Sequence, residues 1–242
     1  MMLFLIPTAK EMTQANALVP YNLPTKVETI SKTMAAFSPQ ELEKIYRIKP
    51  EASQKEYQRW QDFSTDRLKC APALDLYNGL MYRNLKQEAF TQIDRDYLSQ
   101  HVAITSSLYG IISPFEMISE HRLDFNTPVT IEEQSLKNFW RADYDQFLEG
   151  KNCVVSLLSS EFEAVFSPKL RQKLIKVQFL EQRQNELKTH STISKKARGQ
   201  FLFHAMREHC QDLDSLKELS WDGFSYQELL STEQKLVFVK TC

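Results

Sequence analysis

The sequence predicts a mixed α/β protein, in which helices surround a single mixed β-sheet unit. Short apolar runs at residues 3–6, 153–158 and 236–239 are typical of buried strands. Longer stretches such as 136–148 have apolar residues at the spacing of a helix that packs on a core. No repeat, low-complexity tract or long linker interrupts the 242 residues. This pattern favours one domain that spans residues 1–242.

The first 37 residues are expected to form a strand, an irregular segment and a helix. Residues 3–6 are all apolar and end at Pro7, as in a short buried strand. Pro20 and Pro24 interrupt residues 13–24, so we expect that segment to be irregular. A helix is expected at 26–37.

Residues 38–62 are expected to form two short helices joined by a tight turn. Ser38-Pro39-Gln40-Glu41 is a strong helix start, because serine caps, proline suits the first position and glutamate completes a capping box. This helix is expected to end near Lys49-Pro50, and a second one begins near Glu51. The pair is a candidate helix-hairpin-helix element.

Residues 70–128 contain shorter elements separated by turns. Pro72 interrupts the first of them, and residues 77–80 suggest a strand that runs into a turn or a helix. We expect a helix at 94–101 and strands at 103–105, 108–112 and 122–125. The turns that end the last two strands contain Pro114 and Pro128.

The rest of the chain is expected to alternate between helix and strand. A helix at 136–148 carries aromatic residues, and a buried apolar strand follows at 153–158. Residues 174–180 alternate between apolar and polar, which predicts a strand. Residues 188–194 lead into a further helix, and a last short strand is expected at 236–239.

That further helix begins in a strongly basic stretch. Between Leu187 and Arg207 the chain has five Lys or Arg residues and no acid, although its totals are 30 basic and 31 acidic residues. Thr192 or Ser194 is the expected N-cap, and Ala197, Phe201 and Ala205 form an apolar stripe. Cations oppose the dipole at a helix N-terminus, whereas a bound anion would be favoured there. The stretch is therefore either a solvated basic turn or an anion site.

Several common cofactor sites lack their signatures in this sequence. The five glycines are too far apart to form a dinucleotide-binding loop, a P-loop or a hydrolase nucleophile elbow. His204, His209 and Cys210 lie close in sequence, but their spacing matches no zinc or iron motif. We assign no catalytic residue, no metal ligand and no cofactor.

The cysteines and the apolar runs indicate where the protein resides. None of Cys70, Cys153, Cys210 and Cys242 belongs to a C-x-x-C pair, so we expect free thiols in a reducing cytoplasm. No apolar run approaches the roughly 20 residues that a membrane span needs. A cytoplasmic protein without a membrane partner is expected.

Motifs spaced along nearly the whole chain resemble those of one family. They lie at residues 5–10, 75–80, 108–114, 121–124, 139–140, 156–162 and 195–199. The last is an intact Lys-Lys-Ala-Arg-Gly, whereas Pro7, Thr8, His121, Ser156 and Ser160 depart from the family pattern. In their common order these motifs resemble the YaaA peroxide-stress protein family.

The resemblance implies a cytoplasmic protein that protects against hydrogen peroxide, with links to low free iron and reduced oxidative DNA damage. It also implies a mixed α/β fold with a basic cleft and a helix-hairpin-helix element, as in DNA-binding proteins. No established catalytic activity comes with the family, so we lean against an enzyme.

The first functional hypothesis is a cleft that binds duplex or junction DNA through its phosphate backbone. The residues nominated for it are Lys10, Arg122, Lys195, Lys196 and Arg198, with Lys49, Lys55 and Arg59 of the helix pair as second contacts. Arginine can grip phosphate with two donors, and lysine acts as a point charge. No base-reading motif is visible, so we expect little sequence preference. The charge of the helix pair argues against its contact with DNA, because its five basic residues are balanced by five acidic ones.

The alternative is an enzyme that acts on a phosphorylated or nucleotide-like small molecule in the same cleft. The same lysines would bind phosphate, and Asp75, Tyr109, Ser159 or Glu161 would offer acid–base or nucleophilic chemistry. The aromatic residues Phe139 and Trp140 are expected in the core; if exposed, they could stack on a base, although adjacent residues of a helix seldom point the same way.

Overall fold

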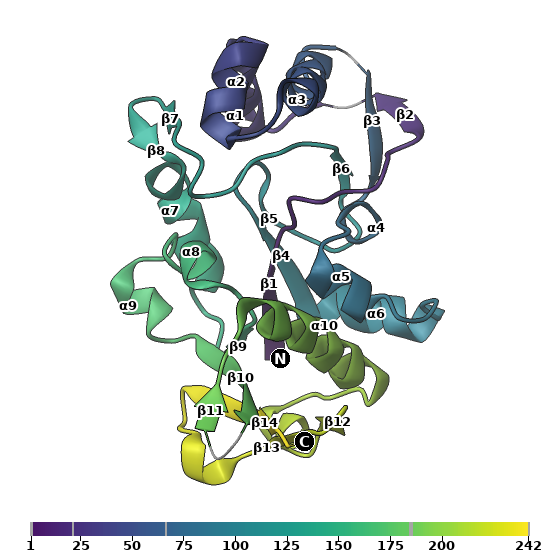
Figure 1. The fold of residues 1–242 in the computed structure, drawn as a ribbon, viewed down its shortest axis with the longest axis vertical. Helices are drawn as coiled ribbons and strands as arrows, with labels where there is room; N and C mark the ends of the chain where they lie inside the picture. The colour runs from purple at the N-terminus through teal and green to yellow at the C-terminus, as the bar shows by residue number, and fades with distance from the viewer. Residues whose placement is uncertain (1, 21, 66, 184–185, 242) are drawn as a thin grey trace.

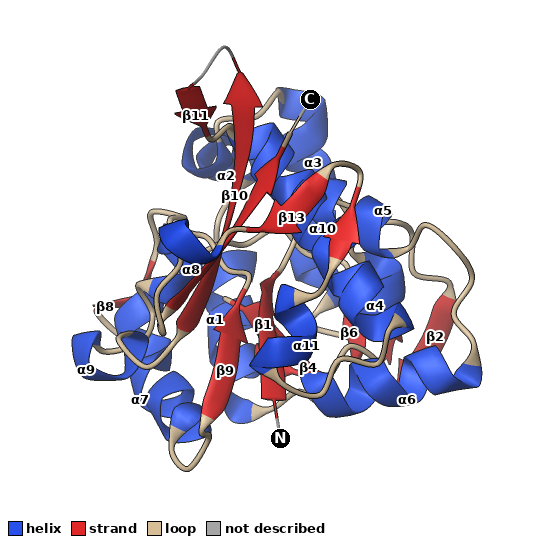
Figure 2. Cartoon of the chain, turned by 90° about the horizontal axis from the view of Figure 1, so that it is seen from below, coloured by secondary structure: helices blue, strands red, loops and turns tan. Residues whose placement is uncertain are grey.

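The large β-sheet of the protein is mixed, and helices lie on both of its sides (Figures 1 and 2). The computed structural model describes residues 2–20, 22–65, 67–183 and 186–241. Across these ranges the large sheet has nine strands, in the order β12-β13-β14-β10-β9-β1-β4-β5, and β11 pairs with β10. Smaller sheets have three and two strands. The predicted mixed α/β class is confirmed.

The central strands of the large sheet run parallel and are buried along nearly their whole length. The central strand is β1 (Met2–Pro7), which pairs in parallel with β4 (Val102–Ser106) and β9 (Cys153–Ser156). Strands buried on both faces read as continuous apolar runs, and helices cover them. The remaining strands of the sheet are β10 (Ile175–Arg183), β14 (Lys235–Lys240), β5 (Gly110–Ile112), β11 (Glu186–Lys188), β12 (Ser220–Trp221) and β13 (Phe224–Tyr226).

The chain reverses its direction of progress across the sheet at β1. It passes from β1 to β4 on one side and then returns to β9 on the other side. In open α/β sheets, ligands bind beyond the carboxyl ends of the strands at such a switch point. Lys10 follows β1, and the short helix α8 (Ser160–Glu163) follows β9. Side chains from both segments are therefore brought to one edge.

Helix α10 (Ser191–Arg207) packs its predicted apolar stripe on the sheet. Ala197, Phe201 and Ala205 are fully buried. The Phe201 ring lies 5.2 Å from that of Phe238 and 6.3 Å from that of Phe4. Helix α10 also lies against α5 (Leu80–Leu85), and an added Cβ at Gly199 would stand 2.1 Å from the carbonyl oxygen of Met81. Only a residue without a Cβ allows this close approach.

The predicted N-cap of α10 is wrong. The helix begins at Ser191 with His190 in the cap position, and no side chain caps it. The hydroxyl of Ser194 is 3.1 Å from that of Thr189 and shares a hydrogen bond with it. The backbone N–H of Ser194 already donates to the His190 carbonyl oxygen, so the helix starts before either predicted cap.

The predicted helix pair forms next to a three-stranded sheet. Helix α2 (Pro39–Tyr46) starts with the expected capping box, in which the Ser38 N–H donates to Glu41 and the Glu41 N–H donates to Ser38. Arg47 ends α2 in the left-handed conformation, and α3 (Pro50–Asp62) follows at once. The neighbouring elements are α1 (Thr25–Ala35), β2 (Ala17–Pro20), β3 (Arg67–Pro72) and β6 (Met117–Ser119).

Two segments differ from their predicted structure. Residues 13–24 contain strand β2, which pairs with β3 although Pro20 ends it. Residues 122–125 form a loop and not a strand. Asp124 accepts from the N–H of Asn126, and its own N–H donates to Thr127, so local hydrogen bonds turn the chain before it can join a sheet.

The other elements are helices that the sequence predicted or short elements that it did not predict. They are α4 (Ala73–Leu76), α6 (Gln92–His101), β7 (Thr130–Ile131), β8 (Gln134–Ser135), α7 (Leu136–Leu148), α9 (Pro168–Arg171), α11 (Leu213–Lys217) and η1 (Glu228–Leu230). Among the described helices, none is both long enough and apolar enough to span a bilayer.

Candidate functional site

A cavity of about 340 Å³ lies at the carboxyl edge of the large sheet, and we call it the Lys10 cavity. Its walls include Lys10 after β1, Tyr46 and Arg47 at the end of α2, Arg122 and Asp124 from the loop after β6, and Glu161 of α8. Segments far apart in the sequence thus place three cations and two carboxylates around one space. Lys10 and Arg122, both predicted site residues, are brought together here.

The two carboxylates of the Lys10 cavity have different environments. The Lys10 Nζ atom is 2.6 Å from Asp124 Oδ2. Burial alone would raise the pKa of Asp124, but the hydrogen bond and charge of Lys10 lower it below its usual range. Burial and the charge of Asp124 together raise the pKa of Glu161. The Oε1 atom of Glu161 is buried and has no hydrogen-bond partner among the described residues.

The two arginines of the Lys10 cavity, unlike its lysine, form no ion pair with a described carboxylate. Arg122 is half-buried, and its guanidinium lies over the Tyr46 ring at 5.7 Å from the centroid. Tyr46 is held in turn by the Trp60 Nε1–H, which donates to its hydroxyl at 3.1 Å. Arg47 is exposed. Within the described ranges, neither guanidinium forms an ion pair with a carboxylate.

The basic stretch of α10 presents two lysines to solvent. Lys195 and Lys196 are both exposed, and in the described part of the chain neither ammonium has a carboxylate partner. Arg198 is half-buried, and its Nε atom is buried with no hydrogen-bond partner among the described residues. Burial lowers the pKa of Arg198, and the nearby Glu163 carboxylate acts against this shift. The lysines are therefore the accessible charges of this stretch.

Helix α8 contributes one glutamate to the Lys10 cavity and another near Arg198 of α10. It contributes Glu161 to the cavity, and Glu163 of the same helix lies close enough to Arg198 to influence its pKa. Glu163 also accepts from the Ser156 hydroxyl at 2.8 Å and pairs with Lys176 at 2.8 Å. Both carboxylate oxygens of Glu163 thus have partners, whereas Oε1 of Glu161 has none among the described residues.

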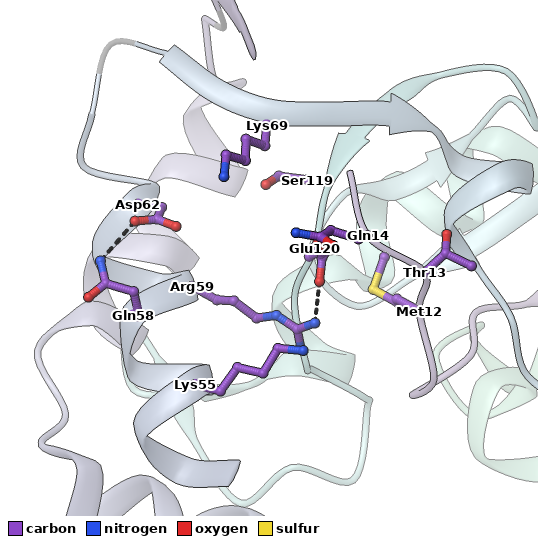
Figure 3. Close-up of a pocket in the computed structure, with 10 residues that line it drawn as sticks. All are labelled: Met12, Thr13, Gln14, Lys55, Gln58, Arg59, Asp62, Lys69, Ser119 and Glu120. Atoms are coloured by element: carbon purple, nitrogen blue, oxygen red, sulfur yellow. Dashed lines mark hydrogen bonds and ion pairs between the residues drawn. The ribbon is translucent and has the colours of Figure 1, made fainter. Parts of the chain in front are cut away.

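A second cavity, of about 490 Å³, lies beside the helix pair (Figure 3). Lys55 and Arg59 of α3 line it, together with Lys69 of β3, which the sequence did not single out. Arg59 forms ion pairs with Glu56 at 2.7 Å and with Glu120, and its side chain is only 14% exposed. Its charge is therefore compensated within the protein, which leaves Lys55 and Lys69 as the available cations there.

The remaining nominated residues are dispersed or structural. Lys49 is exposed at the N-cap of α3 and lines neither cavity. Asp75 is exposed outside both cavities. Tyr109 is buried, and its hydroxyl accepts from the Ser119 N–H at 3.0 Å. Phe139 and Trp140 are buried as predicted, and Trp140 donates to the Ser107 carbonyl.

The cysteines contribute to packing. Cys70, Cys153 and Cys210 are free thiols, as predicted, and Cys242 lies outside the described residues. Burial raises the pKa of all three thiols, which disfavours the reactive thiolate. His204 stacks on Trp221, and no group of three potential ligands gathers around a common point in the described ranges.

Asp124 is the principal site residue that sequence reasoning missed. It belongs to the stretch 121–124, which had been noted as a motif but expected to be a strand. The structure instead has a turn at Asn126, and the Asp124 carboxylate meets Lys10. An Asp followed two and three residues later by Asn and Thr was the available signal for that turn.

Comparison with known proteins shows similarity along the whole chain. The model of the family described as peroxide stress protein YaaA matches residues 2–230. A UPF0246 protein of Streptococcus thermophilus is 53% identical over 241 residues, which cover 99% of this chain and 98% of that protein. UPF0246 proteins of Streptococcus pyogenes serotype M3 and Streptococcus agalactiae serotype III are 50% and 49% identical over 240 residues, with 99% of each chain covered.

Proposed function

The chain belongs to the YaaA peroxide stress protein family, and from this premise we propose that it protects cytoplasmic DNA during peroxide stress. In this proposal the protein binds DNA through the phosphate backbone and limits iron-dependent oxidative damage to it. The binding surface is the basic stretch of α10 together with Arg122.

The observation that carries this proposal is the pair of exposed lysines on α10. Lys195 and Lys196 lie in an acid-free stretch, and no described carboxylate neutralises either one. An unpaired surface ammonium can neutralise a phosphate and release the cations condensed on the nucleic acid, which is the main source of affinity for nucleic acid backbones. Arg198 lies on the same helix and adds a half-buried guanidinium.

The other nominated residues contribute unequally. Lys10 is held by Asp124 and would have to leave this ion pair to reach a phosphate. Arg59 is similarly held by two carboxylates. Arg122 has no ion-pair partner in the described ranges, and Lys49 and Lys55 are exposed. We therefore place the primary contacts on α10 and Arg122, and secondary contacts on the helix pair.

Fluorescence anisotropy with labelled duplex and four-way-junction DNA tests this proposal. The parent protein should bind both DNAs more weakly as salt rises, because each phosphate contact adds about −0.9 to the slope of log K against log salt. Lys195→Ala/Lys196→Ala should weaken binding at every sequence alike and reduce that slope by roughly 2. The matched control, Lys169→Ala/Lys173→Ala, removes two exposed lysines elsewhere and should bind as the parent does. Absence of binding at low salt would refute DNA binding, and unchanged binding by the first variant would exclude the α10 lysines.

A peroxide challenge tests the protective role. A strain that lacks the gene should accumulate more DNA lesions than its parent, and the wild-type gene should restore the parental count. The Lys195→Ala/Lys196→Ala gene should fail to do so if protection depends on DNA binding. Equal lesion counts with and without the gene would rule out protection.

A second function is favoured by the Lys10 cavity: chemistry on a phosphorylated or nucleotide-like small molecule. Two carboxylates whose environments move their pKa values apart are the usual arrangement for an acid and a base in one site. Asp124 and Glu161 have this relationship. Release of phosphate or of a base from nucleoside monophosphates, absent in Glu161→Gln, would support an enzyme.

A further inference from the structure

The Lys10 cavity contains a buried polar atom that the protein itself leaves without a partner. Oε1 of Glu161 is shielded from solvent, yet no described residue donates to it or accepts from it. Buried side-chain oxygens in folded proteins almost always have a hydrogen-bond partner, and an exception calls for an explanation. Because Glu161 lines the cavity, a rotation of its carboxyl group would present this oxygen to a ligand there.

The position of the cavity is the one at which open α/β sheets bind ligands. It lies beyond the carboxyl ends of β1 and β9, where the strand order reverses. At about 340 Å³ it falls at the lower end of the size range of small-molecule pockets, about 300–1,000 Å³. It is thus suited to a molecule the size of one nucleotide or sugar.

The charges around the cavity define what such a molecule carries. Arg47 and Arg122 have no ion-pair partner among the described residues, and guanidinium groups match phosphate oxygens in geometry. Asp124 and Glu161 also line the cavity, and their carboxyl groups disfavour a second negative group. The complementary ligand has one phosphate and an otherwise uncharged, polar body.

We propose that the Lys10 cavity binds a small phosphate monoester, with its phosphate on Arg122 and Arg47 and its hydroxyl-bearing or ring-nitrogen body hydrogen-bonded to Glu161. This assignment deepens the second function above and rests on it; it shares Arg122 with the DNA proposal but does not involve the lysines of α10. Lys10 keeps Asp124 ionised and in place.

The protonation state of Glu161 gives this binding a recognisable signature. Burial and the Asp124 charge raise the pKa of Glu161, so its carboxyl group retains a proton more readily than an ordinary glutamate. A protonated carboxyl both donates and accepts a hydrogen bond, whereas a carboxylate only accepts. Binding through the protonated form weakens as pH rises past the pKa of Glu161, and glutamine in its place removes that dependence.

Isothermal titration calorimetry of the full chain tests the proposal with ribose 5-phosphate and the four ribonucleoside 5′-monophosphates as probes. At least one probe should bind saturably to the parent. Arg122→Ala should lower that affinity by about tenfold or more, as expected for the loss of a charged hydrogen bond. Glu161→Gln should retain affinity within a few-fold and lose the pH dependence that is not due to the phosphate itself. Ribose 5-phosphate and the nucleotides distinguish a sugar phosphate from a ligand whose base is also recognised.

Matched controls separate this proposal from the DNA proposal. Lys195→Ala/Lys196→Ala should bind the probe as the parent does, although we expect it to lose affinity for DNA. Circular dichroism and thermal unfolding establish that each variant is folded. Failure of all probes to bind at millimolar concentration would overturn the proposal, as would unchanged binding by folded Arg122→Ala. Loss of probe binding in the α10 variant would also overturn it, because the phosphate would then be bound outside the cavity.

Discussion

Acidification from neutral pH should destabilise the protein through a single buried histidine, His121. This residue is 3% exposed, and its ring packs edge-on against Tyr109 and Tyr77. Its Nδ1 atom is 2.9 Å from the Ser119 carbonyl oxygen, which can only accept, so Nδ1 carries the proton of the neutral ring. A second proton would have to enter an apolar environment near the charge of Arg59.

The size of the effect follows from the pKa of His121 in the two states. Burial lowers this pKa from its usual value of 6.5 to about 4, although the hydrogen bond to Ser119 acts in the opposite direction. Because the unfolded chain binds this proton more readily, the stability is fully present above the unfolded pKa and is lost as pH falls toward 4. At about 1.4 kcal/mol per pKa unit, the loss is about 2 kcal/mol at pH 5 and approaches about 3 kcal/mol near pH 4.

Urea unfolding at about pH 7 and about pH 5 measures this loss as a change in the free energy of unfolding. His121→Gln removes the titrating ring, so its unfolding free energy should fall by about 2 kcal/mol less than that of the parent over this interval. His190→Gln replaces an exposed histidine and should keep the parental pH dependence. If His121→Gln loses as much stability as the parent, the buried imidazole is not the cause of acid sensitivity.

Three further changes test the packing that supports the site. Gly199→Ala should lower the unfolding free energy by about 1–3 kcal/mol, because the new Cβ would overlap the Met81 carbonyl oxygen; an unchanged urea midpoint would contradict the close approach of α10 and α5. Ser38→Ala removes the capping box of α2 and should cost about 1 kcal/mol, seen as a lower melting temperature. Arg59→Ala leaves part-buried carboxylates unpaired and should cost up to about 3 kcal/mol, and adding Glu120→Ala should restore part of this loss in a double-mutant cycle. Strictly additive losses would show that the ion pair contributes nothing.

Local patterns in the sequence were enough to predict much of the fold. The apolar run at 3–6 became the central strand β1, and the capping box at Ser38 started α2 where expected. The apolar stripe of α10 is buried as its four-residue spacing indicated. Each of these features depends on residues within one or two turns of each other, which is the range over which backbone preference and amphipathic spacing act.

Errors arose where distant residues or local hydrogen bonds outweighed the pattern. Strand β2 exists because β3 offers it a partner, which no property of residues 17–20 reveals. The loop at 122–125 resembles a strand in its alternation, but the turn formed by Asp124 prevents pairing. The N-cap of α10 lies before the residues that favour capping, since Ser194 is engaged with Thr189.

In the candidate site, too, the sequence predicted some features and only the folded chain determined others. The sequence by itself identified most of its charges: the acid-free stretch of α10, Lys10 after the first strand, and Arg122 and Glu161 within recognisable motifs. The folded chain determined which of these charges are available. Lys10 meets Asp124, Arg59 meets Glu120, and Oε1 of half-buried Glu161 has no hydrogen-bond partner, whereas Lys195 and Lys196 stay unpaired within the described ranges. Charge type is a property of a residue, but the free energy of that charge depends on neighbours and solvent exposure, and these exist only once separate segments pack together.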